Sequence, residues 1–174
     1  MVKTKSQGSA VAEQSNSRIT PQAVGAYGEK VVEAELLRYG WMPANVNKTV
    51  PNAEAFDIFA NKGDTLVKLR VRTCGPGTPG FVFPPFQENR QFDDQDFTVL
   101  VKMASKREDD QIFVIPTKCL HKNIEGYAAP AIARGLKNKR WTLQFAEHPK
   151  GERSNLGFDR KWAKYRGNWK LLEG

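Results

Sequence analysis

One short segment of the chain, residues 56–73, concentrates ionisable side chains within an apolar pattern. Its sequence is FDIFANKGDTLVKLRVRT, in which Asp57 interrupts the first apolar run and Lys68, Arg70 and Arg72 alternate with apolar residues in the second. Because side chains alternate between the two faces of a strand, the three cations share one face. A carboxylate can coordinate a metal ion, whereas lysine and arginine bind phosphate oxygens. The same pattern also fits a solvated sheet face with cross-strand ion pairs.

This segment is predicted to form a β-hairpin in the middle of a sheet. Gly63 and Asp64 stand where the chain has to reverse direction. The apolar residues fill the face of each strand that lies opposite the charges: Phe56, Ile58 and Ala60 in the first and Val67, Leu69 and Val71 in the second. We therefore expect Asp57 to share a face with the three cations.

A second acid, Glu29, lies on a helix predicted for residues 21–39. Thr20 is a suitable N-cap, Pro21 fits the first helical position, and Gly40 is a typical residue to end a helix. The predicted core stripe consists of Val24, Tyr27, Val31 and Ala34. Glu29 lies off this stripe and is a candidate site residue, whereas Glu33 and Glu35 fit a solvated helix surface.

The remaining elements follow from short apolar runs and from turn residues. The sequence predicts an edge strand within residues 41–51, strands at 97–103, 111–115 and 140–146, and a short helix at 117–123 followed by a loop. Residues 74–92 carry three glycines and four prolines and are predicted to be an irregular connection. The aromatic residues of this connection, Phe81, Phe83 and Phe86, either pin it to the core or stack on nucleic-acid bases.

The C-terminal quarter combines aromatic residues with a high positive charge. A helix is predicted from Asp159 onward, because Trp162, Tyr165, Trp169 and Leu172 recur at helical spacing and form a core stripe. The cations around this stripe are Arg160, Lys161, Lys164, Arg166 and Lys170. Residues 134–170 contain eleven lysines and arginines but only three acids. This charge excess predicts contact with phosphate groups.

Length and composition favour a single domain over residues 20–174, preceded by a disordered arm at residues 1–19. The chain of 174 residues has a formal net charge of +8, which favours a polyanionic partner. Two isolated cysteines and two histidines give no zinc or disulfide pattern. No apolar run is long enough for a membrane span, and we expect a cytoplasmic protein without membrane contact.

The order of these motifs resembles that of the PD-(D/E)XK nuclease superfamily, especially its small members with a restriction-endonuclease-like fold. The resemblance covers residues 20–120 and is carried by Gly28-Glu29, FDIFA, LVKLRVRT and IFVIP. It implies an α/β fold with a mixed central sheet flanked by helices. It also implies that Glu29 and Asp57 bind Mg²⁺. Arg70 stands where the family has Glu or Gln, and Arg72 stands where it has the catalytic lysine.

Three functions remain open on these grounds. In the first, the chain binds DNA or RNA with a weakened or lost metal site, and Lys68, Arg70 and Arg72 hold phosphate directly. In the second, it is an active Mg²⁺-dependent endonuclease that hydrolyses phosphodiesters with an arginine variant of the motif. In the third, it is an interaction or immunity-type protein. A homodimer is compatible with each function.

Overall fold

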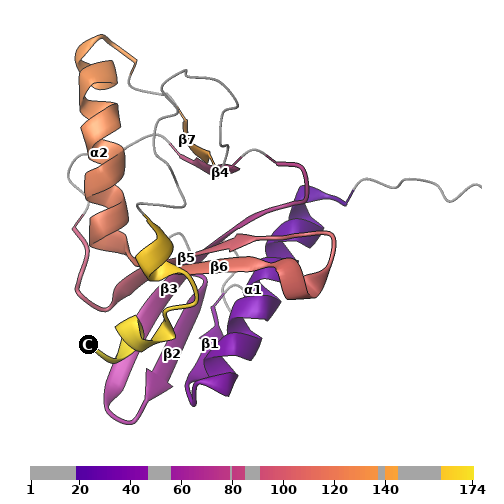
Figure 1. Ribbon diagram of the computed structural model, residues 1–174. Helices are drawn as coiled ribbons and strands as arrows, with labels where there is room; N and C mark the ends of the chain where they lie inside the picture. Colours follow the sequence, from indigo (N-terminus) through magenta and orange to yellow (C-terminus); the bar gives the residue numbers. More distant parts are fainter. Residues whose placement is uncertain (1–18, 47–55, 79, 85–90, 137–139, 145–161) are drawn as a thin grey trace, which may run out of the picture.

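The protein has an α/β fold with a mixed five-stranded central sheet flanked by helices, as predicted. The computed structural model describes residues 19–46, 56–78, 80–84, 91–136, 140–144 and 162–174. The central sheet has the order β1-β2-β3-β5-β6 (Figure 1). Its strands are β1 (Met42–Asn45), β2 (Ile58–Lys62), β3 (Thr65–Cys74), β5 (Asp96–Lys102) and β6 (Gln111–Pro116). Strands β3 and β5 are parallel, and the other neighbouring pairs are antiparallel.

The predicted hairpin lies mid-sheet and is formed by β2 and β3. Gly63 adopts a φ of 57°, which a glycine reaches without strain, and the strands pair with Ile58 opposite Leu69. Ile58, Leu69 and Val71 are buried on the face that packs against α1 (Pro21–Arg38). The predicted edge strand is confirmed as β1, and the predicted pair beyond the hairpin is confirmed as β5 and β6.

Helix α1 begins and ends close to the predicted residues. The Thr20 side chain accepts a hydrogen bond from the backbone N–H of Ala23 at 3.2 Å, and Pro21 occupies the first turn. Gly28 is buried where the helix crosses β3, and a Cβ at this position would lie 1.8 Å from Oγ1 of Thr73. The close approach of helix and strand therefore requires glycine at this position.

On the opposite face of the central sheet, α2 (Thr117–Ala133) packs on β5 and β6, and a small second sheet adds to the same core (Figure 1). This second sheet pairs β4 (Gly80–Phe83) with β7 (Trp141–Gln144). The predicted strand at 140–146 is thus present, but the irregular connection predicted for 74–92 contains a strand. Phe81 and Phe83 are buried and support the core alternative, whereas Phe86 lies outside the described residues.

Helix α2 is longer than the sequence predicted. It continues through Pro130 to Ala133 and does not end near residue 123. Gly126 and Pro130 both disfavour a helix locally. Burial of Leu120, Ala128 and Ala131 outweighs this local preference. Among the described residues, no helix is both long and apolar enough to cross a membrane.

The C-terminal segment also differs from the prediction of one helix. The described part contains two short 3₁₀ helices, η2 (Ala163–Tyr165) and η3 (Trp169–Glu173), separated by Gly167 with a φ of 58°. The expected core stripe is nevertheless buried: Trp162, Tyr165, Trp169 and Leu172. Of the predicted arm, only Ile19 is described; Arg160 and Lys161 lie outside the described residues.

Candidate functional site

Asp57 directly precedes the first residue of β2 and lies beside the longer strand β3. Its backbone N–H donates to the carbonyl oxygen of Leu69 at 2.9 Å, and its Oδ2 accepts a hydrogen bond from the N–H of Val71 at 2.7 Å. The first residue of β2, and the first to pair with β3, is Ile58. The carboxylate of Asp57 therefore takes the place of a strand carbonyl, and this charged acceptor fixes its position at the edge of β3.

Glu29 lies at the same corner of the sheet, and the last residues of β1 connect it to Asp57. The amide nitrogen of Asn45 donates to Oε2 of Glu29 at 2.8 Å and to Oε1 of Glu33 at 2.9 Å. The next residue, Val46, donates its N–H to the carbonyl oxygen of Asp57 at 2.9 Å. Two consecutive residues of the β1 end therefore contact the helix acid and the strand acid. Glu29 and Asp57 are both half-buried.

The three cations of β3 point away from α1. Lys68, Arg70 and Arg72 are half-buried and alternate with the buried residues of the face that packs on α1. Glu29 reaches the corner from the α1 side of the sheet, and Asp57 lies at the edge between the two faces. The structure thus gathers two acids at one corner and directs the adjacent cations along the other face.

Lys68 already has acidic partners. Its Nζ donates to Asp93 at 2.7 Å, lies 3.3 Å from Asp96, and lies 5.3 Å from the ring centroid of Phe56. The hydrogen bond to Asp93 raises the pKa of Lys68, and the same contact lowers the pKa of Asp93. A phosphate at Lys68 would therefore have to displace Asp93.

The described residues do not form a magnesium site with three protein ligands. No group of three or more His, Cys, Asp or Glu side chains in the described ranges is arranged to hold a metal ion. Glu29 and Asp57 are two carboxylates, and at least one oxygen of each accepts a hydrogen bond from a nitrogen donor. Arg70 and Arg72, the neighbours of Val71 on β3, offer no carboxylate to a metal ion, and their positive charge opposes Mg²⁺.

The C-terminal cations lie at the other edge of the sheet. Arg166 forms an antiparallel bridge with Phe113 of β6, and Nζ of Lys164 lies 4.9 Å from the ring centroid of Tyr165. Both cationic side chains are exposed. In the order of the sheet, β6 is three strands from β2, which is about 14 Å at 4.8 Å per strand. Lys164 and Arg166 are therefore not brought next to Asp57.

A separate polar cluster attaches α1 to the β5–β6 turn. The hydroxyl of Tyr27 donates to Oδ2 of Asp110, and the backbone N–H of Ala104 donates to Oδ1 at 2.8 Å. Arg107 lies 3.6 Å from Asp110 and 3.7 Å from Glu35. Burial, reinforced by the bond to Asp110, raises the pKa of Tyr27 to about 12. This cluster stabilises the fold and lies away from Asp57.

The sequence did not single out Asn45, which orients Glu29, or Asp96, which neutralises Lys68. Asn45 is the last residue of a short edge strand, and its role cannot be inferred until the position of Glu29 on α1 is known. Asp96 is a buried acid at the start of an apolar strand. That unusual position was the signal that could have identified Asp96.

The chain was compared with known protein families, curated proteins and solved structures. No family model matches the chain, and no curated protein matches it. A solved structure described as that of a bacterial homing endonuclease aligns with a TM-score of 0.47 and 13% sequence identity. The alignment covers 88% of this chain and 94% of the other.

Proposed function

We propose that the protein binds nucleic acid through the β3 face that carries Arg70 and Arg72, and that its PD-(D/E)XK-like metal site is weakened or lost. The observation that supports this proposal is the position of the two arginines beside Asp57. Val71, which lies between them in the sequence, donates its N–H to the Asp57 carboxylate at 2.7 Å. The two cations are thus held on a central strand next to a fixed acid.

Arginine suits this position for phosphate and not for metal. Its planar guanidinium offers five N–H donors that match phosphate oxygens in pairs, and it stays charged at any physiological pH. Half-burial of Arg70 and Arg72 limits their freedom before a ligand arrives. A guanidinium within about 4 Å of a divalent ion would repel it by several kcal/mol even at an effective dielectric constant near 20.

The test is a binding titration with labelled duplex and single-stranded DNA and RNA at low salt. The variant Arg70→Gln with Arg72→Gln should lose at least about tenfold in affinity, as two charge-assisted contacts are removed. The control variant Lys118→Gln with Arg134→Gln removes the same charge from exposed positions on and directly after α2. Equal losses in the two variants would reject the β3 face as the binding surface.

A metal-dependent endonuclease is the second candidate, and it is favoured by the position of Glu29 and Asp57 at one corner. Cleavage of DNA or RNA that requires Mg²⁺ and disappears in Asp57→Ala would make the endonuclease the better-supported function. Our proposal predicts little cleavage by the wild type. It predicts that Arg70→Glu combined with Arg72→Lys gains Mg²⁺ affinity, because this pair adds a carboxylate and removes both guanidinium groups.

A further inference from the structure

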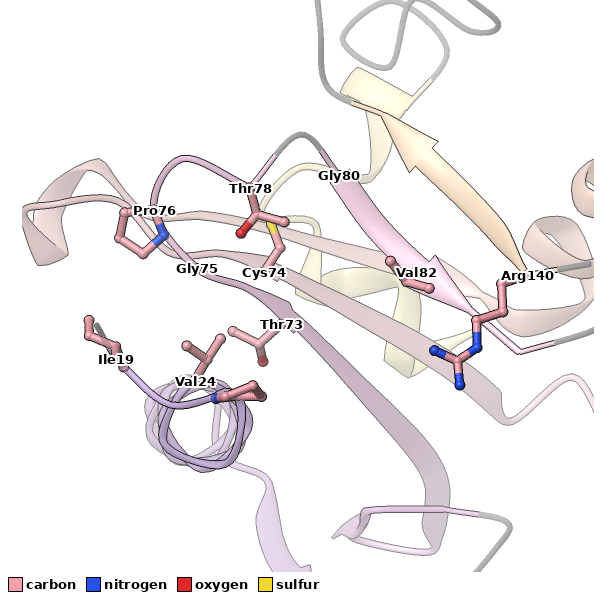
Figure 2. A pocket seen from close by; sticks show the side chains of 11 residues that line it. Ile19, Val24, Thr73, Cys74, Gly75, Pro76, Thr78, Gly80, Val82 and Arg140 are labelled. Carbon is pink, nitrogen blue, oxygen red and sulfur yellow. The ribbon is translucent and has the colours of Figure 1, made fainter. Parts of the chain in front are cut away.

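A large cavity opens beside the end of β3, next to the corner that holds Asp57. Its volume is about 1110 Å³, and it lies between the start of α1, the turn after β3, and the β4–β7 sheet (Figure 2). The side chains that determine its chemistry are those of Val24, Thr73, Pro76, Thr78, Val82 and Arg140. A volume of this size can hold a ligand as large as a nucleotide, since small-molecule sites span roughly 300–1,000 Å³.

The cavity has more apolar than polar wall, and its one charged lining side chain among the described residues is the cation Arg140. Val24 on α1 and Val82 on β4 face the space from opposite sides, and the guanidinium end of Arg140 points toward it (Figure 2). None of the described lining residues is an acid. Within the described part of the chain, no ion pair or hydrogen bond engages the Arg140 side chain. The cavity therefore suits a ligand with an apolar ring and a negative group.

The cavity continues the edge of β3 that Asp57 occupies. The backbone N–H and C=O groups of every second strand residue point to the same edge. The carbonyl of Leu69 and the N–H of Val71 both point to this edge and bind Asp57. Thr73 is the next residue of this series, lies beyond the end of β2, and lines the cavity. Two residues of a strand span about 7 Å, so Thr73 at the cavity lies about 7 Å along β3 from Val71, which binds Asp57.

We infer that the cavity binds one unpaired nucleotide of the nucleic acid, adjacent to the phosphate held at Arg70 and Arg72. The base lies between the apolar side chains of α1 and β4, and its polar edge faces the hydroxyl of Thr78 and the strand edge at Thr73. Arg140 pairs with the phosphate of the same nucleotide. A base in a duplex cannot enter, because its edge is paired and its ring is stacked. The inference rests on the proposed function and specifies its substrate as a strand with an unpaired base.

The test compares two fluorescent single strands of equal length and charge, one normal and one abasic. The normal strand should bind about tenfold more tightly, a difference of about 1.4 kcal/mol, which lies within the range for one enclosed base. Val82→Trp should abolish this preference, because Val82 is 52% exposed and a tryptophan there fits the fold but fills the cavity. Thr78→Trp, at an exposed position on the other wall, provides a second variant should the first not fold.

Two matched controls separate the cavity from general effects. Leu136→Trp adds the same ring at a position that is 50% exposed and does not line the cavity. Arg140→Gln should reduce affinity for the normal strand more than Arg134→Gln, although both remove one charge. Equal affinity for the normal and abasic strands in the wild type would overturn this inference and leave the proposed function intact. Absence of binding to either strand at low salt would overturn both.

Discussion

Substitution of Gly28 by alanine tests the contact that fixes α1, and with it Glu29, against β3. The added Cβ would lie 1.8 Å from Oγ1, 2.9 Å from Cβ and 3.0 Å from Cγ2 of Thr73. Rotation of the Thr73 side chain can move Oγ1 away, but its Cβ is fixed to the strand. The helix must therefore shift, as in other overpacked cores, at about 1–3 kcal/mol.

Helix propensity opposes this cost. Replacing a glycine within a helix by alanine stabilises it by about 1 kcal/mol. Gly28→Ala should therefore lower the free energy of unfolding by up to about 2 kcal/mol once both effects are combined. Gly25→Ala is the matched control, because it lies in the same helix and a Cβ there meets no atom within 4 Å. The control should be stabilised by up to about 1 kcal/mol.

Urea unfolding followed by circular dichroism measures both variants. The expected difference between them is about 1–3 kcal/mol, which is the overpacking cost alone. Thr73→Ala in the Gly28→Ala background should recover part of the loss, because it removes Oγ1 and Cγ2. Equal stability of Gly28→Ala and Gly25→Ala would refute the close approach of α1 and β3.

Three further predictions concern individual contacts. Asp57→Ala should lower the free energy of unfolding by about 1–3 kcal/mol, because the N–H of Val71 loses its acceptor, and Asp57→Asn should recover part of this in urea titrations. An ultraviolet titration of the wild type against Tyr27→Phe should assign a pKa of about 12 to Tyr27. Since this pKa is raised in the folded state, its stabilising contribution should be complete below pH 10 and be lost as the pH rises toward 12, and an ordinary pKa of 10 would contradict the bond to Asp110. Mass spectrometry should show that iodoacetamide modifies exposed Cys119 well before Cys74, whose pKa burial raises to about 11.

The parts of the fold that depend on residues close together in the sequence could be predicted from it. The hairpin follows from Gly63-Asp64 between two alternating runs, and α1 follows from the Thr20 cap and Pro21. The pairing of β4 with β7 could not be predicted, because each is a four-residue run whose partner lies far along the chain. Burial of Ala128 and Ala131 also overrides the local preference at Pro130.

The candidate site was predictable in its residue types but not in its contacts. The sequence placed Asp57 on a strand beside the cations, but the bond to Val71 depends on where β2 begins relative to β3. In the same way, Asn45 gains its role only when β1 lies beside Glu29. The cavity at Thr73 is formed by three segments distant in sequence, so no local pattern could indicate it.

The salt dependence of nucleic-acid binding tests the central claim most directly. The logarithm of the affinity for duplex DNA falls linearly with the logarithm of the salt concentration, by about 0.9 for each phosphate neutralised. Arg70→Gln with Arg72→Gln should therefore reduce the steepness of this slope by about 1.8. The control Lys118→Gln with Arg134→Gln should leave it unchanged. A slope that is the same in wild type and in the Arg70 and Arg72 double variant would contradict phosphate binding by this face of β3.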